Sequence, residues 1–267
     1  IRPSGNLIIS GPHASAHLSL NGLVIEGKIA VETNLDLEIE HCTLMPAGLE
    51  TRVEESVLTA LHVSISNSIA GPLRLPAGMA GLVIRDSILA NPSGYAIAAP
   101  GRDDSPGPPT TLERVTVFGE VHIQSLKLAS EVIFNGPVLV QERQAGLVRF
   151  SYVPNGSQTP RREHCQPDGG LASRATELGV SLEAMDERET KLTNALLRPI
   201  FTSTRFGDPA YAQLARRCPK QIRRGAADGS EMGVFHQLHQ PMREDNLYPI
   251  LNEYLPVGLE AGIIIET

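Results

Sequence analysis

Ile39-Glu40-His41-Cys42-Thr43-Leu44 is the first clear copy of a short motif that recurs through the first 120 residues. The motif places an apolar residue, a variable residue, a small polar residue or His, and a small residue before an apolar pair. It returns at Ile65–Ile69 and Ile84–Leu89, and more loosely at Leu112–Val117, so successive copies start 26, 19 and 28 residues apart. The alternating apolar residues that precede the copies are typical of strands.

The recurrence of strand-rich units predicts a coiled architecture for the first half of the chain. Irregular repeats of about 20 to 50 residues are typical of solenoids, whose coils must stack to bury their inner faces. His41, Asn67 and Asp86 share one motif position, as expected for a corner, because Asn and Asp tolerate left-handed backbone. We therefore predict that residues 1–153 form a right-handed parallel β-helix. An antiparallel sandwich of short strands is the alternative.

The sequence changes character after residue 153. Polar, proline-containing sequence is followed by helical spacing of leucines, with helices expected from about Ser181 to Leu197, from Asp208 to about Arg217 and from about Ser230 to Leu255. Because a terminal coil exposes an apolar cross-section, we predict that residues 154–267 form a mainly helical segment that caps the stack. The tail, residues 262–267, is expected to add a final strand.

Composition narrows the classes of function. The 267 residues carry a formal net charge of −7, which is not the basic excess of a general nucleic-acid binder. Trp is absent and aromatic residues make up 4%, which weakens a carbohydrate site built on stacking rings but leaves hydrogen-bonded sugar sites open. No apolar run is long enough to span a membrane. The start at Ile1 suggests a fragment of a longer protein.

Two pairs of residues are weak candidates for chemistry. Asp103 and Asp104 lie in a proline-rich loop, where a solvated turn is the commoner explanation than functional acids. His236 and His239 are three residues apart on a predicted helix, with Glu231 about one turn earlier. A metal site would need a third ligand and an open position, and surface or half-buried helix histidines are more frequent.

One basic cluster is a candidate patch for a phosphate group or an acidic partner. Its members are Arg216, Arg217, Lys220, Arg223 and Arg224. The simpler alternative is that these side chains pair with Asp228, Glu231 and the acidic edge of the coils. The nearby segment Phe201–Asp208 is predicted to be a turn that docks a helix onto the coils.

The three cysteines are not typical of a disulfide scaffold. Cys42 lies in the repeat and is expected to be a small buried residue. Cys165 and Cys218 could meet in the fold, and the sequence leaves open whether they pair. The cations beside Cys218 could lower the pKa of its thiol, but no His companion at a familiar spacing supports a cysteine nucleophile. The sequence contains no catalytic set, cofactor motif or metal motif.

The chain from residue 136 to the end resembles one group of proteins. The strings that carry the resemblance are Gly136–Pro154, Ser157–Arg162, Cys165–Asp168, Phe201–Pro209, Ile222–Gly225, Gly229–Gly233 and Gly258–Gly262. They are similar to the C-terminal region of large bacterial proteins that often accompany phage-tail-like contractile injection systems. The upstream coils resemble pectin-lyase-like parallel β-helix proteins only generically. The resemblance implies a particle-associated or surface-associated protein and supplies no catalytic residues.

These observations favour a non-enzymatic structural or binding module. Its expected partner is a protein in a larger assembly or the N-terminal domains of the same protein, with a surface glycan as a further candidate. The expected location is the bacterial cytoplasm or a released particle. The alternative is a glycan-processing enzyme, which would require three or more Asp, Glu or His side chains converging on one coil face beside Arg or Lys. A third, weaker hypothesis is an effector activity around His236, His239 and Cys218.

Overall fold

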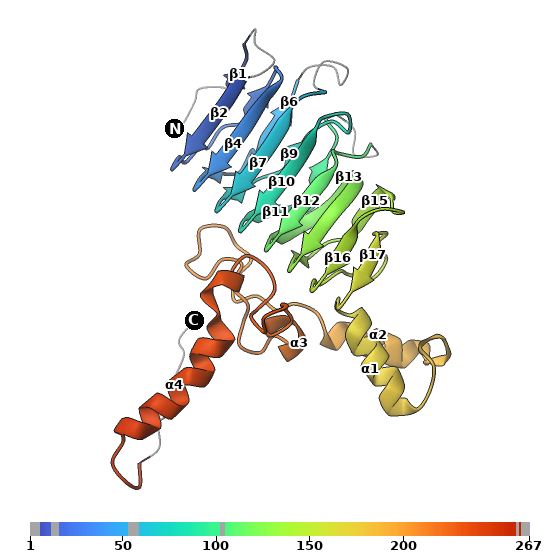
Figure 1. The fold of residues 1–267 in the computed structure, drawn as a ribbon, viewed down its shortest axis with the longest axis vertical. Coiled ribbons are helices and arrows are strands. Elements are labelled where there is room, and N and C mark those ends of the chain that lie inside the picture. The colour runs from blue at the N-terminus through green and yellow to red at the C-terminus, as the bar shows by residue number, and fades with distance from the viewer. Residues whose placement is uncertain (1–5, 12–15, 53–58, 102–104, 260–261, 263–267) are drawn as a thin grey trace.

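The computed structural model describes residues 6–11, 16–52, 59–101, 105–259 and 262 (Figure 1). In this part of the chain 17 strands form one curled sheet, and the pairings between its named strands are all parallel. The strands are β1 (Leu7–Ile9), β2 (Ala16–Asn21), β3 (Ile29–Val31), β4 (Leu35–Glu40), β5 (Thr43–Leu44), β6 (Leu49–Thr51), β7 (His62–Ser66), β8 (Ile69–Ala70), β9 (Leu73–Arg74), β10 (Gly81–Arg85), β11 (Ile88–Ala98), β12 (Thr110–Glu113), β13 (Thr116–Ser130), β14 (Ile133–Phe134), β15 (Val138–Glu142), β16 (Leu147–Arg149) and β17 (Arg161–Glu163). The antiparallel sandwich is therefore excluded.

The pairings fall into three ladders. Ladder 1 contains β2, β4, β7, β10, β12, the end of β13, β16 and β17. Ladder 2 contains β5, β8, the start of β11, the start of β13, and β14. Ladder 3 contains β1, β3, β6, β9, the end of β11, the middle of β13, and β15. The chain visits the ladders in turn, so like segments lie on like segments.

The core follows directly from the motif. In β4 and β7 every second residue is buried, and Leu37 pairs in register with Val63, which pairs with Leu82. Such apolar stacking continues along the sheet because strands that alternate apolar and polar residues turn one side inward. The buried side chains form one continuous cluster that extends from Ile25 to Cys165.

One corner repeats along the whole stack in a left-handed conformation. His41, Asn67 and Asp86 have φ values of 52°, 48° and 46°, which confirms the corner predicted for them. The corner continues at Arg114, Glu131, Phe150 and His164. Each of these residues donates its backbone N–H to the next rung, as His41 does to the Ser66 carbonyl at 3.2 Å. Hydrogen bonds between rungs therefore impose the left-handed backbone even where the side chain does not favour it.

A ladder of small side chains lies just inside this corner. Ser68, Ser87 and Ser151 each donate the hydroxyl to the carbonyl two residues earlier. Ser87 Oγ also accepts the Ser68 N–H at 3.1 Å. Cys42 and Cys165 occupy the equivalent places, with their thiols directed at the carbonyls of Glu40 and Glu163. The prediction that Cys42 is buried is confirmed.

The helices follow the last strand. They are α1 (Asp168–Leu178), α2 (Glu187–Leu196), α3 (Lys220–Arg223) and α4 (Gln240–Tyr254), with 3-10 turns at η2 (Leu182–Ala184) and η3 (His236–Leu238). Pro241 lies at the start of α4, as its expected helix break suggested, but Pro249 lies within the helix. The final strand expected at residues 262–267 lies outside the described residues, apart from Gly262, which is not in a strand.

The helix predicted from Asp208 to Arg217 is wrong. This stretch consists of turns, and it is tied back to the preceding segment by bridges between Phe201 and Leu214 and between Ser203 and Tyr211. Asp208 accepts a hydrogen bond from Ser203 Oγ instead of capping a helix. Packing of Tyr211 and Leu214 against the sheet therefore overrides the local helix-start signal.

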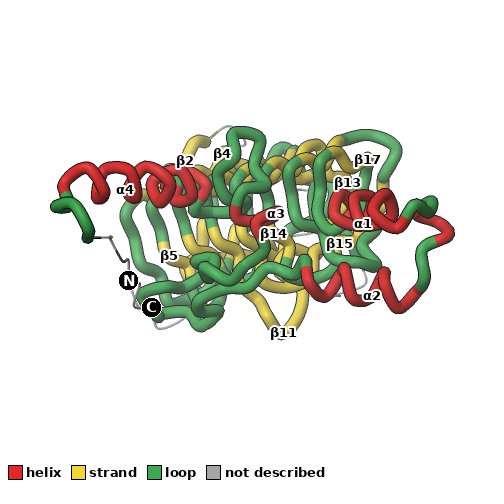
Figure 2. Tube along the Cα trace, turned by 90° about the horizontal axis from the view of Figure 1, so that it is seen from below, coloured by secondary structure: helices red, strands yellow, loops and turns green. Residues whose placement is uncertain are grey.

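The segment between α2 and α4 covers a side of the stack. Tyr211, Val234 and Phe201 pack against outward-facing residues of ladder 2, including Ile88 and Phe118. Farther along, Ile133 and Tyr152 pack against Leu214, Ile222 and Met232. Figure 2 shows α3 beside β14, between the α1–α2 pair and α4. The prediction that the whole C-terminal segment covers the end of the stack is therefore wrong for residues 200–235, which contact ladder 2 laterally.

Candidate functional site

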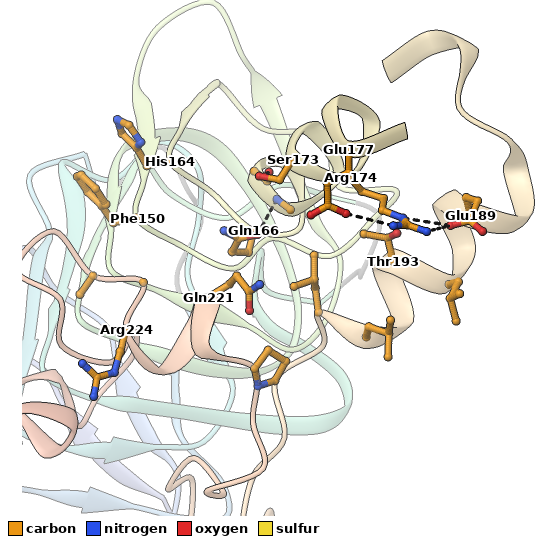
Figure 3. Close-up of a pocket in the computed structure, with 18 residues that line it drawn as sticks. Phe150, His164, Gln166, Ser173, Arg174, Glu177, Glu189, Thr193, Gln221 and Arg224 are labelled. Carbon is orange, nitrogen blue, oxygen red and sulfur yellow. Dashed lines mark hydrogen bonds and ion pairs between the residues drawn. The ribbon is translucent and has the colours of Figure 1, made fainter. Parts of the chain in front are cut away.

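A groove of 910 Å³ lies where the last corner of the stack meets the helices (Figure 3). One end is formed by Phe150 and His164, whose rings stack with centroids 5.0 Å apart and planes within 8°. Helices α1 and α2 form the opposite wall, and the segment around α3 contributes the remaining side. The groove therefore joins three parts of the chain that are far apart in sequence.

The lining of the groove is amphipathic. Leu192 and Leu196 of α2 line it and are 52% and 66% exposed. The side chains of Gln166 and Gln221 lie near its middle in Figure 3. Arg174 forms ion pairs with Glu177 and Glu189, each at 3.1 Å. Exposed leucines beside hydrogen-bonding amides are typical of surfaces that bind peptides or proteins.

The two candidate histidines belong to a polar cluster at the junction between the stack and the C-terminal segment. His236 Nε2 lies 3.3 Å from Asp228 Oδ1 and 3.5 Å from Glu131 Oε2. His239 Nδ1 lies 2.6 Å from Ser230 Oγ. Burial acts to raise the pKa of Asp228, but hydrogen bonds from Ser230 and the positive potential of the two imidazoles outweigh it and lower that pKa.

This cluster has the residue types of a hydrolase but not the required access. Ser230 is fully buried, so its hydroxyl cannot meet a substrate carbonyl without a rearrangement. The groups that act on the charge of Glu231 are Arg223 and Glu244, not the two histidines. In the described ranges no set of three or more His, Cys, Asp or Glu side chains is arranged to hold a metal ion.

The basic cluster is divided by its contacts with α4. Arg223 pairs with Glu244 at 2.8 Å and Arg224 pairs with Asp245 at 2.6 Å. Salt-bridge partners were expected, but α4 supplies them in place of Asp228. Arg217 and Lys220 lie on the exposed surface, and the Arg216 carbonyl accepts a hydrogen bond from Arg223. Two of the five cations are thus engaged in holding α4.

The cysteines are buried and free, so Cys165 and Cys218 do not form a disulfide. Burial raises the pKa of each of these two thiols to about 11. The expectation that neighbouring cations lower the pKa of Cys218 is wrong because loss of hydration outweighs the attraction to Arg223. A buried thiol with this pKa is not a nucleophile at neutral pH.

A row of titratable side chains on ladder 1 was missed in the sequence. His62 Nδ1 lies 2.9 Å from Asp36, and His17 Nδ1 lies 3.3 Å from the same carboxylate. The hydrogen bond with His62 is the main cause that lowers the pKa of Asp36. The signal was present as equivalent positions of successive repeats, because register places His17, Asp36 and His62 on adjacent rungs. The candidate acids Asp103 and Asp104 lie outside the described residues.

Comparisons with protein-family models, with curated proteins and with solved structures found no match. None of the helices in the described part of the chain is long and apolar enough to cross a membrane. The argument for function therefore depends on the geometry of this chain alone.

Proposed function

We propose that this chain is a right-handed parallel β-helix that serves as a rigid scaffold and presents its C-terminal helices to a protein partner. The in-register parallel ladders and the continuous apolar interior support the β-helix. The position of α1 and α2 next to β17 supports a capping role for these two helices (Figure 1). Lateral packing of residues 200–235 on ladder 2 adds stiffness to the scaffold.

The groove is the single observation that carries the binding role. Soluble monomers seldom expose neighbouring large apolar side chains unless the surface is used, and Leu192 and Leu196 are both more than half exposed. They line the same groove and are supported by a helix that is itself held to α1 by the Arg174–Glu189 ion pair. A preformed surface of this kind loses little conformational freedom when a partner binds.

The identity of the assembly is proposed from the sequence resemblance of residues 136–267 to proteins that accompany contractile injection particles. In this proposal the partner is a component of such a particle or another domain of the same protein. Binding is tested by co-sedimentation of the purified chain with contractile particles from the producing bacterium. Leu192→Glu together with Leu196→Glu is expected to weaken binding at least about tenfold, since a buried charge lacks a partner.

Leu182→Glu is the matched control for the groove variant. Leu182 is 52% exposed, like Leu192, but it is not among the residues that line the groove. This control is expected to bind as the unmodified chain does. Equal binding by the groove variant and the control would contradict a role for the groove, and no sedimentation with any particle fraction would contradict the particle assignment.

A glycan-processing activity is the second candidate, favoured by the His17–Asp36–His62 row. The row brings acidic and imidazole side chains together on one outer face, which meets part of the requirement for such an enzyme. However, the next rung after His62 in this row is Gly81, so no Arg or Lys continues the row. We expect no release of unsaturated or reducing products from polygalacturonate, with or without calcium. Release above the buffer control that Asp36→Asn abolishes would establish the alternative.

A further inference from the structure

A second cavity lies on the other side of α2 from the groove. It has a volume of 310 Å³, and its polar lining comprises Asn135, Tyr152, Asn155, Asn194 and Arg198. Asn194 and Arg198 are four residues apart, so they point to the same side of the helical segment. Leu192 and Leu196 line the groove instead. Helix α2 thus separates an amphipathic groove from a small polar pocket.

The pocket contains an acceptor that the fold leaves without a donor. Asn194 Oδ1 is buried and has no hydrogen-bond partner among the described residues. Buried polar atoms are nearly always paired, and an exception calls for an explanation. A ligand that donates an N–H or O–H group to this oxygen would satisfy it.

The pocket also contains a cation. The described residues provide no carboxylate partner for Arg198 within ion-pair distance, and its side chain belongs to an exposed residue. Its charge is felt inside the pocket, because burial raises the pKa of Tyr152 while Arg198 acts in the opposite direction. A guanidinium group presents a planar fork that matches a carboxylate. The complementary ligand therefore carries a hydrogen-bond donor close to an anion.

A peptide fits this pocket better than a sugar. Saccharide sites commonly use an open aromatic face, and the pocket's one aromatic residue, Tyr152, is only 5% exposed. A peptide segment with Asp or Glu supplies both required groups, a main-chain N–H and a side-chain carboxylate. The Asn135 and Asn155 amides can hydrogen-bond to further main-chain groups.

We propose that this pocket binds an acidic side chain of the protein partner, with the carboxylate held by Arg198 and an adjacent main-chain N–H accepted by Asn194 Oδ1. This assignment rests on the proposed role of the chain as a partner-binding module and names the chemistry of the partner. An apolar stretch of the partner occupies the groove, and an acidic residue enters the pocket, so that α2 is held from both sides.

The test uses small probes on the full chain, followed by NMR. Titration with N-acetyl-aspartate N-methylamide is expected to shift the side-chain amide of Asn194 and the guanidinium signal of Arg198. The neutral analogue, N-acetyl-asparagine N-methylamide, is expected to bind at least about tenfold more weakly. Arg198→Gln and Asn194→Ala are each expected to remove the shifts. Arg188→Gln, which removes an exposed cation of α2 that lines neither cavity, is expected to leave them unchanged.

Three results would overturn the assignment. Absence of shifts at about 20 mM probe would show that the pocket does not bind peptides. Equal binding of acetate would show simple ion pairing without the main-chain contact, and tighter binding of galacturonate would show a saccharide site. These outcomes are separable from failure of the scaffold proposal, because the groove variants test particle binding without using the pocket residues.

Discussion

Single residues along the left-handed corner show how stacking dominates over local preference. Asn67 and Asp86 are suited to positive φ, but Arg114 and Phe150 adopt it as well. Each of these N–H groups donates to the next rung, and Asp86 accepts two hydrogen bonds from the Arg114 guanidinium at 2.6 and 2.8 Å. Hydrogen bonds and ion pairs between rungs therefore offset the cost of the left-handed backbone, about 1–2 kcal/mol per residue.

Glu231 makes stability depend on pH. Burial raises the pKa of its carboxyl to about 7 from an ordinary value of 4.5, so the folded chain binds this proton more tightly than the unfolded chain. The free energy of unfolding therefore falls as pH rises from about 4.5 to about 7, and the loss is then constant. Glu231→Gln is expected to stabilise the protein by about 1–3 kcal/mol at about pH 8 and to have little effect at about pH 5.

The measurement is urea denaturation of both proteins at the two pH values. Glu183→Gln, which changes an exposed carboxyl in η2, is the control and is expected to leave the difference between the two conditions unaltered. If Glu231→Gln had the same effect at both pH values, ionisation of this buried carboxyl would not contribute to the pH dependence.

At the scale of elements, the loop that precedes η3 holds the C-terminal segment to the stack. Gly233 donates its N–H to the Glu131 carbonyl at 2.8 Å, and Val234 donates to Thr116 Oγ1 at 3.1 Å. A Cβ atom on Gly233 would lie 2.6 Å from Thr116 Oγ1 and 2.9 Å from Ile133 Cδ1. Glycine is thus required both by a φ of 89° and by the close approach to ladder 2.

Gly233→Ala is expected to lower the free energy of unfolding by about 2–4 kcal/mol, because the methyl group separates the loop from the sheet. Gly207→Ala is the matched control, since Gly207 has a φ of 98° and no atom within 4 Å of the added Cβ. It is expected to cost only the backbone term, about 1 kcal/mol. Equal losses in chemical denaturation would show that the contact with ladder 2 contributes nothing.

At the scale of the whole molecule, the lateral segment hides an apolar strip that the stack would otherwise expose. The strip includes Ile88, Phe118, Ile133 and Tyr152, which are buried under the segment from Ile200 to Phe235. Exposed apolar strips of this kind promote association. The segment is therefore needed for the stack to remain monomeric.

Removal of residues 199–267 is expected to leave the parallel strands folded but to cause self-association, measured by circular dichroism and light scattering. Phe118→Thr with Ile133→Thr in the shortened chain is expected to restore monomers, since Thr suits a strand and reduces the exposed apolar surface. A monomeric shortened chain without these substitutions would contradict the covering role. Loss of strand signal would show instead that the stack cannot fold without the segment.

Much of the stack could be predicted because its information is local and repeated. The spacing of Ile39, Ile65 and Ile84 is also the spacing of paired rungs, since parallel strands with one buried side align equivalent residues. The small residue after each corner is equally readable, which is why Cys42 was assigned to the interior. The loop acids could not be assessed in this way, because two adjacent carboxylates indicate neither their surroundings nor a partner.

The sequence by itself determined the parallel repeat, the position of the corner and the change to helices. Only the tertiary structure decided where the C-terminal segment lies, that α4 pairs with Arg223 and Arg224, and that two cavities flank α2. The physical reason is the range of the interactions. Periodic burial and left-handed corners leave a pattern within each repeat, whereas docking depends on contacts between residues more than 100 positions apart, such as Val234 with Thr116.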